Sequence, residues 1–447
     1  MNSEEKKYAS LILLHIVIGM VIFYIPALSK SFAALVFIIG LFLVVKNQNK
    51  NQEVLLVSGY IVGSEILFRM SGGIIIYEYA KYCITFFMIL GMYYNGFSKN
   101  AVPYWVFLIL LIPGLLVATE TLNLTTDLRK TISFNISGPI CLGICSIYAY
   151  NKPLSINKLN QILLFTSLPI VSITVYLILY TPDLKEALVL GTGSNYFTSG
   201  GFGPNQVATI MGLGMFIFFS RLMLESKTKV LFIINILVTF FVVYRGLLTF
   251  SRGGMVTGFI MIVILLYYLY RSTQHRGKAK LNYIFGVMVL LFFAIWSYTS
   301  TQTDGLIEKR YANQDASGRV KESQLTGREE IFTNEINSFI NNPIFGIGVA
   351  KGVEDRLNLT QEVALSHSEI SRMMAEHGMF GIVALLVLLF TPIVLFLDNR
   401  QHIFLWCFIV FWLLTINHAA MRISAAAFIY SLSLFKVYIN EKNPLHR

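Results

Sequence analysis

The chain has 447 residues, of which 55% are hydrophobic and 13% charged, and its mean hydropathy is +0.65. This composition excludes a soluble or disordered chain and indicates an integral membrane protein. The formal net charge of +11 is scattered in pairs and triplets between apolar runs, so it predicts membrane topology and not nucleic-acid binding.

Long apolar runs dominate the sequence. Runs such as 8–27 and 229–250 are long enough, at about 17 to 25 residues, to cross the hydrocarbon core as helices. A transmembrane β-barrel would instead show short segments of alternating hydrophobicity. We therefore expect an all-α, polytopic transmembrane helical bundle of about 12 to 14 spans, forming a single integral membrane domain over residues 1–447. The predicted crossings lie near residues 8–27, 31–45, 54–70, 73–94, 102–118, 131–150, 161–181, 205–224, 229–250, 253–270, 281–300, 379–397, 402–417 and 420–438.

Basic residues are concentrated in every second connection between these runs. Examples are Lys46 with Lys50, and the dense block 271–280. Because positively charged connections stay in the cytoplasm, these connections predict the inner side of the membrane. Both termini then lie inside, whereas the connection 182–204 and residues 251–252 lie outside.

A long polar stretch, residues 301–378, occupies another outer connection. Most connections in such a protein are short, so a connection of this length indicates a function beyond joining two helices. Spaced apolar residues after Thr326 predict a short amphipathic helix lying along the membrane surface. We therefore expect a large, partly helical extracytoplasmic loop that carries catalytic motifs.

The first motif along the chain is TSGGFGPNQVATIMG, residues 198–212. Its glycines and Pro204 predict a turn, and Asn205 can begin a helix. The structural interpretation is a loop followed by a helix cap. The functional interpretation is a substrate loop around Gly203 and Asn205, whose exposed amides hold an anionic or hydroxyl-rich ligand.

The second motif is YRGLLTFSRGGMVTG, in which Arg245 and Arg252 are seven residues apart. They share one helix face if the helix continues between them, and two arginines near the membrane surface are costly without partners. Snorkelling to headgroups is the alternative for Arg245. For Arg252, flanked by Ser251 and Gly253, the guanidinium fork favours bidentate binding of a diphosphate.

The third motif is TGREEIF, with Arg328 near the start of the predicted amphipathic helix. A solvated ion pair with Glu322 or Glu330 is the structural interpretation of this arginine.

The fourth motif is SHSEISRMMAEHGMFG, which leads from the outer loop into the next span. A lone histidine is often structural. An imidazole titrates near neutrality, however, and His367 at the outer surface is suited to taking a proton from a sugar hydroxyl.

Later in the chain His418 and Arg422 are four residues apart, which places them on one helical face. They either extend a diphosphate site or cap a helix pair.

Together these motifs resemble the O-antigen ligase and O-antigen polymerase superfamily of bacterial membrane glycosyltransferases. The resemblance rests on GFGPNQVA, TFSRGG, TGREEIF and HSEISRMMAEHGMFG, in this order, between about residues 195 and 385. The first half of the chain matches only as generic membrane spans.

The resemblance implies transfer of a glycan from undecaprenyl diphosphate to an acceptor at the periplasmic face of the bacterial inner membrane, with inversion at the anomeric carbon. It makes Arg252, Arg328 and His367 catalytic: the arginines neutralise the donor diphosphate, and the histidine assists the acceptor hydroxyl. Arg245 and Arg422 are further candidates for diphosphate binding, and His418 joins Gly203 and Asn205 as a candidate substrate contact. Membrane lipids are the other expected partners.

No cofactor or metal is expected. A lipid diphosphate is already a good leaving group, and the sequence has no Asp-x-Asp or Glu-x-Asp pair to hold a divalent ion near the sugar. Arginine would take the place of the metal.

The motifs do not determine which of two acceptors receives the glycan. A ligase delivers a finished polysaccharide to lipid A core, whereas an O-antigen or exopolysaccharide polymerase joins two lipid-linked repeat units. The long outer loop and the order of Arg252, Arg328 and His367 favour the ligase, and the polymerase is the alternative.

A second alternative is a transporter or flippase of lipid-linked glycans. Such proteins usually show internal repeats and polar groups at the middle of the membrane. The pairs Glu65 with Arg69, and Glu78 with Lys81, fit this alternative best, and they are equally consistent with intramembrane ion pairs that support the structure.

Overall fold

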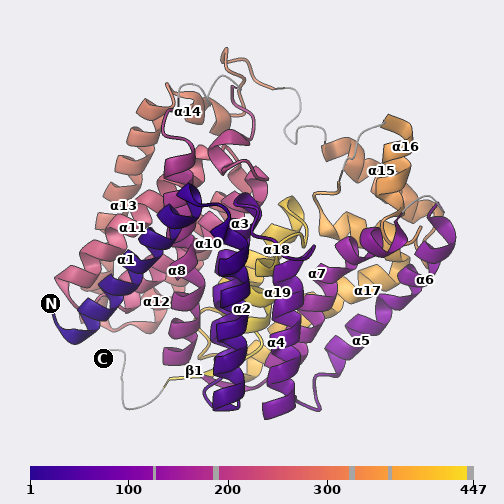
Figure 1. The fold of residues 1–447 in the computed structure, drawn as a ribbon, viewed down its shortest axis with the longest axis horizontal. Helices are drawn as coiled ribbons and strands as arrows, with labels where there is room; N and C mark the ends of the chain where they lie inside the picture. Colours follow the sequence, from indigo (N-terminus) through magenta and orange to yellow (C-terminus); the bar gives the residue numbers. More distant parts are fainter. Residues whose placement is uncertain (124–126, 185–190, 322–327, 361–364, 440–447) are drawn as a thin grey trace. The chain divides into compact units, whose positions relative to one another are not determined.

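The computed structural model describes residues 1–123, 127–184, 191–321, 328–360 and 365–439, and these are mainly helical (Figure 1). Two short strands, β1 (Pro153–Ser155) and β2 (Lys436–Tyr438), pair with each other. The predicted all-α class is therefore confirmed. The chain divides into two compact units, the first made of residues 1–77, 154–322 and 437–447, and the second of residues 78–153 and 323–436.

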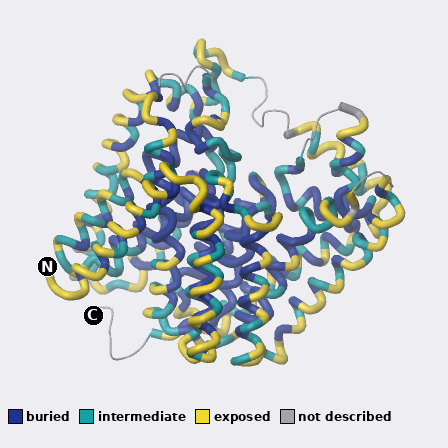
Figure 2. Tube along the Cα trace, in the orientation of Figure 1, coloured by how far each residue is buried: buried dark blue, intermediate teal, exposed yellow. Residues whose placement is uncertain are grey.

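The first unit is built around two long central helices. Within their most apolar windows, 72% of residues are buried in α8 (Ile156–Tyr180) and 83% in α10 (Pro204–Leu224), whereas only 12% are buried in α13 (His275–Gln302) (Figure 2). The central helices therefore form the core, and α13 presents its apolar residues outward, as a helix in contact with lipid does. The other helical segments of this unit are α1 (Ser3–Tyr24), α2 (Leu28–Asn47), α3 (Glu53–Met70), η2 (Phe197–Ser199), α11 (Lys229–Leu248), α12 (Arg252–Ser272) and α14 (Leu306–Tyr311).

Glycines bring α10 and α12 into close contact. A Cβ atom added to Gly212 would lie 2.0 Å from the Gly254 carbonyl oxygen. A Cβ atom added to Gly258 would lie 2.3 Å from the Gly212 carbonyl oxygen. Only glycine allows backbones to approach this closely, as is common between membrane helices. Gly254 of the SRGG motif is thus used for helix packing.

The second unit contains α4 to α7 and α15 to α19. Its core includes α19 (Ser424–Leu432), every residue of which is buried, and the hydroxyl groups of Tyr430 and Tyr104 are 2.8 Å apart. The other helices of this unit are α4 (Tyr79–Asn95), α5 (Val102–Leu110), α6 (Ile112–Thr121), α7 (Leu128–Ala149), α15 (Arg328–Asn341), α16 (Lys351–Thr360), α17 (Glu369–Asp398) and α18 (Leu405–His418).

Gly378 divides α17 into two helical segments. It has φ +60° and ψ −138°, and a Cβ atom there would lie 2.5 Å from the Ile344 carbonyl oxygen. Only glycine accepts this combination of conformation and close approach. The segment Glu369–His377 therefore precedes the kink, and the apolar segment begins at Met379, where the sequence predicts the start of a crossing.

Ten helices in the described part of the chain are long and apolar enough to cross a membrane, with α5 and α6 taken together as one. Pro113 accounts for the break between those two helices, because proline removes a backbone donor. The remaining predicted crossings coincide with shorter or more polar helices, namely α3, α4, α18 and α19. A polytopic helical bundle is confirmed, and the number of spans stays a prediction.

The charged pairs noted in the sequence form ion pairs inside each unit. In the first unit Arg69 Nη2 lies 2.9 Å from Glu65 Oε1, and in the second Lys81 Nζ lies 2.6 Å from Glu78 Oε2. Lys81 also donates to Ser137 Oγ at 3.3 Å. These contacts support the structural interpretation of the four charges.

Candidate functional site

In the first unit the candidate site surrounds the turn between α11 and α12. The helix stops at Leu248 and a new helix begins at Arg252, with Phe250 between them at φ +55°. The helix therefore does not continue between the two arginines, and the condition under which Arg245 and Arg252 would share one helix face is not met.

Arg245 lies inside the first unit. Its side chain is 2% exposed, and Nη2 donates a hydrogen bond to the Leu177 carbonyl oxygen of α8. Snorkelling to lipid headgroups does not describe this side chain, because a guanidinium held by a buried carbonyl does not extend to the surface.

The loop before α10 is tied to the α11–α12 turn. The backbone N–H of Asn195 donates to the Thr249 carbonyl oxygen at 2.9 Å, and Ser251 Oγ donates to Asn205 Oδ1 at 2.7 Å. The helix α10 begins at Pro204, one residue before the predicted start, with Gly203 as its N-cap residue. The predicted substrate loop and the SRGG motif therefore meet in space.

Arg252 lies in a group of cationic side chains that the sequence analysis missed. Its Nη1 donates to the Arg310 carbonyl oxygen at 3.4 Å, and Arg310 Nε donates to the Phe250 carbonyl oxygen at 2.8 Å. Burial lowers the pKa of Lys321, and the positive charges of Arg310 and Arg252 lower it further, while Asp315 opposes them. Burial also raises the pKa of Tyr311 to about 12, although both arginines act in the opposite direction. A cluster of like charges of this kind favours binding of an anion.

Arg328 is the first residue of α15 in the second unit. Its side chain, Thr326 and Glu322 lie outside the described residues. A short helix is present where the sequence predicts one, since α15 runs from Arg328 to Asn341, with Glu335 buried and Phe332 and Ile340 exposed. Its position along the membrane surface stays a prediction.

His367 lies just before α17, on the wall of a cavity of about 170 Å³. The backbone of this segment is held by the turn after α18, since the Ala420 amide donates to the His367 carbonyl oxygen at 3.2 Å. The cavity is lined by Ile331, Phe332, Glu335, Ser366, His367, Ser368, Ser371 and Asn417. A histidine in a hydroxyl-rich cavity can exchange hydrogen bonds with a polar substrate.

The same turn brings Arg422 to the His367 segment. The helix α18 ends at His418 and α19 begins at Ser424, so the four-residue spacing does not place His418 and Arg422 on one helix face, and that expectation is wrong. Arg422 Nη2 donates to the Ser366 carbonyl oxygen, whereas His418 Nδ1 lies 2.7 Å from the Leu414 carbonyl oxygen of its own helix.

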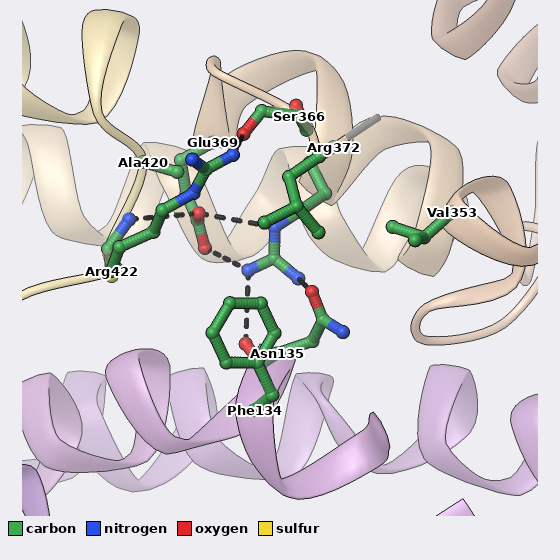
Figure 3. Close-up of a pocket in the computed structure, with 10 residues that line it drawn as sticks. Phe134, Asn135, Val353, Ser366, Glu369, Arg372, Ala420 and Arg422 are labelled. Carbon is green, nitrogen blue, oxygen red and sulfur yellow. Dashed lines mark hydrogen bonds and ion pairs between the residues drawn. The ribbon is translucent and has the colours of Figure 1, made fainter. Parts of the chain in front are cut away.

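The charged residues after His367 form a buried network, of which Figure 3 shows Glu369 and Arg372 beside Asn135. Arg372 is paired with Glu369, and its Nη1 also lies 2.7 Å from Glu376 Oε2. Arg372 Nη2 donates to the Asn135 carbonyl oxygen of α7 at 3.2 Å, and Glu369 Oε2 accepts the Met421 amide at 3.2 Å. One arginine thus connects the start of α17 with α7 and with the turn after α18, which fixes the position of the His367 segment.

Glu335 is a further residue that sequence reasoning missed. It is 4% exposed, and its Oε2 accepts hydrogen bonds from Ser371 Oγ at 2.6 Å and Ser366 Oγ at 3.2 Å. The signal available in the sequence is its place seven residues after Arg328, which corresponds to the same side of a helix.

The candidate residues thus fall in both units: Gly203, Asn205, Arg245 and Arg252 in the first, and Arg328, His367, His418 and Arg422 in the second. Within the described residues, no three His, Cys, Asp or Glu side chains gather in a way that could hold a metal ion. Metal-independent catalysis stays a prediction.

These features define a polytopic helical membrane protein whose basic and histidine residues gather where apolar helices begin or end. Residues 236–386 match the family model described as O-antigen ligase. This match confirms, over residues 236–386, the resemblance to the O-antigen ligase superfamily that the motifs indicate, and members of the matched family are membrane glycosyltransferase-like enzymes. No curated protein matches the chain.

Proposed function

We propose that this protein is an O-antigen ligase that moves a polysaccharide from undecaprenyl diphosphate to lipid A core at the outer face of the bacterial inner membrane. The observation that carries the proposal is the family match, because residues 236–386 include Arg245, Arg252, Arg328 and His367. The apolar helices around these residues support a multi-pass protein that takes a lipid-linked donor from the bilayer.

The donor site of the proposal is the cationic group around Arg252. As the acceptor oxygen bonds to the anomeric carbon, the bond from that carbon to the diphosphate breaks, and the electron pair leaves with the diphosphate. Arg252 and Arg328 neutralise the growing negative charge, with Arg245 and Arg422 as further diphosphate contacts. Attack from the face opposite the leaving group inverts the anomeric carbon.

The acceptor site of the proposal contains His367. The imidazole accepts the proton of the acceptor hydroxyl, or orients that hydroxyl by a hydrogen bond, while the oxygen attacks. Gly203, Asn205 and His418 are the further substrate contacts that we propose. No metal or other cofactor takes part in the proposed reaction, so a strict loss of activity on chelation that magnesium or manganese restores would contradict it.

The test is complementation of a strain that lacks this gene. The wild type, Arg252→Ala, His367→Ala and the control Arg319→Ala are expressed to equal levels in the membrane, and lipopolysaccharide and lipid-linked glycans are compared on gels. Arg319 is an exposed residue of the same outer stretch, so its loss is expected to leave the glycan profile unchanged.

We expect Arg252→Ala and His367→Ala to lose polymer-bearing lipopolysaccharide while long lipid-linked chains accumulate. Lipid A core that carries a single repeat unit would indicate a polymerase instead. A normal profile in both variants would contradict the catalytic assignment and favour a transporter of lipid-linked glycans.

A further inference from the structure

The cavity beside His367 has the dimensions of a small binding site. Its volume is about 170 Å³, and its wall is contributed by α15, the segment before α17, the first turn of α17 and the end of α18. Pockets for drug-sized ligands usually measure roughly 300 to 1,000 Å³, so this cavity fits one sugar ring and not a length of glycan chain.

The wall of the cavity has one apolar side and one hydroxyl-rich side. Phe332 and Ile331 of α15 form the apolar side, and Phe332 is 50% exposed, so its ring is open to a ligand. The serines Ser366, Ser368 and Ser371 supply hydroxyl groups. A sugar needs both kinds of surface, because its ring has an apolar C–H face and its rim carries hydroxyl groups.

Glu335 places a carboxylate in the same wall. Its Oε2 accepts from Ser371 and Ser366, and its Oε1 lies 3.5 Å from Arg356 Nη1 of α16, the contact that the structure gives for this oxygen. A carboxylate has about four acceptor sites, so the contacts with these described residues leave Oε1 able to accept a hydrogen bond from a sugar hydroxyl.

The surroundings of Glu335 hold this carboxylate in place. Arg356 faces it from α16, and Arg372 and Glu376 interact with it electrostatically from α17. Burial raises the pKa of Glu335, against the effect of the hydrogen bond from Ser371 and of the charge of Arg356. A buried carboxylate fixed by two serines is costly to retain, and it is well placed to select and orient a polar ligand.

We propose that this cavity binds one sugar ring of the acceptor and that Glu335 orients the ring by accepting a hydrogen bond from one of its hydroxyl groups. This inference rests on the proposed function, in which His367 assists the acceptor hydroxyl. Glu335 is then a residue that determines acceptor binding, while the diphosphate of the donor is bound by arginines. The prediction that separates these roles is a change in acceptor affinity without a change in donor affinity.

The experiment measures transfer by the full-length protein in detergent or nanodiscs. Lipid A core purified from cells that lack the gene is the acceptor probe, and a lipid-linked glycan extract from the same cells is the donor. Rates are measured against each substrate in turn for the wild type, Glu335→Gln and Ser371→Ala. Glu330→Gln is the matched control, because it removes an exposed carboxylate from the same helix.

We expect Glu335→Gln to raise the half-saturating acceptor concentration by about tenfold or more, the loss typical of a hydrogen bond to a charged group. Ser371→Ala is expected to act in the same direction and Glu330→Gln to have no effect. The half-saturating donor concentration should stay within about twofold of the wild type in all variants.

Two results would overturn the inference. If Glu335→Gln leaves the acceptor constant unchanged, or shifts the acceptor and donor constants equally, the cavity does not bind the acceptor. If the wild type itself transfers no glycan to this acceptor, the proposed function fails and this inference fails with it. The wild-type rate therefore distinguishes the two failures.

Discussion

Single residues in the candidate site depend on partners that are distant in the sequence. Arg252 is identified by its motif, but the structure shows that Arg310, 58 residues later, shares its surroundings and also supports the Phe250 carbonyl. His367 is identified in the same way, whereas Glu335 joins its cavity from a different helix. A motif reports the residues that are adjacent along the chain, and packing decides which others join them.

Arg372 is expected to be the most important charge for the stability of the second unit. Replacing it with methionine leaves Glu369 and Glu376 buried without their cation, and breaking a buried ion pair in this way costs about 3 to 5 kcal/mol. We expect Arg372→Met to lower the unfolding temperature of the protein in detergent. Arg400→Met, an exposed arginine in the same unit, serves as the control.

An equal unfolding temperature for Arg372→Met and Arg400→Met would contradict this expectation. It would mean that the three charges are solvated or neutral in the folded protein, and that the network does not hold the His367 segment in place.

Glu335 is expected to make stability depend on pH. Because burial raises its pKa in the folded protein, the folded state binds this proton more tightly than the unfolded state does. Its contribution to stability is therefore fully present below the unfolded pKa, and it is lost as the pH rises through the raised folded pKa. We expect the unfolding temperature of Glu335→Gln to rise relative to that of the wild type over this interval, as measured by thermal scans across the acidic range.

A difference between Glu335→Gln and wild type that stays constant with pH would contradict the raised pKa. Such a result would mean that Glu335 contributes to stability only through hydrogen bonds that glutamine can also form.

At the scale of helices, two breaks between consecutive apolar helices position the candidate site residues. Phe250 at φ +55° separates α11 from α12, and Ala420 at φ +50° lies between α18 and α19. Neither residue type predicts a left-handed conformation. Tertiary contacts support both breaks, since Arg310 binds the Phe250 carbonyl and the Ala420 amide binds the His367 carbonyl.

Gly254 is expected to control the packing of α12 against α10. A Cβ atom at this position would lie 2.2 Å from the Ala208 carbonyl carbon, a backbone atom that cannot move aside. We expect Gly254→Ala to destabilise the protein by about 1 to 3 kcal/mol and to lower activity, because α12 begins with Arg252. Thermal unfolding and the glycan profile measure the two effects.

Gly286 in α13 is the matched control, since within the described part of the chain no packing neighbour beyond its own helix backbone lies within 4 Å of a Cβ atom added there. Alanine is expected to stabilise this helix by up to about 1 kcal/mol, because alanine has the higher helix propensity. If Gly254→Ala is as stable as Gly286→Ala, the close approach of the two helices does not occur.

At the scale of the whole molecule, the distribution of positive charge predicts which connections lie outside. The native cysteines Cys83, Cys141, Cys145 and Cys407 are all buried, so a membrane-impermeant maleimide is expected to react weakly with the parent protein. We expect Ser317→Cys to be labelled in intact spheroplasts and Lys99→Cys to be labelled only after permeabilisation, because both positions are accessible and lie in connections of opposite predicted side.

Labelling of Lys99→Cys in intact spheroplasts, with Ser317→Cys protected, would reverse the topology. The residues around Arg252 and His367 would then face the cytoplasm, and transfer to lipid A core at the outer face would be excluded.

The sequence alone determined that this is a helical membrane protein, because chains this apolar must satisfy their backbone hydrogen bonds within helices when they cross a bilayer. The sequence also contains the arginine and histidine motifs. Their residue types and order carry the family resemblance, which the match over residues 236–386 confirms for that segment. Tertiary structure alone decided the left-handed backbone of Phe250 and Ala420 at the predicted breaks, the burial of Arg245 and the presence of Arg310 and Glu335 beside the motifs. Those features depend on contacts between helices that are far apart along the chain, and hydropathy and spacing describe only what is local.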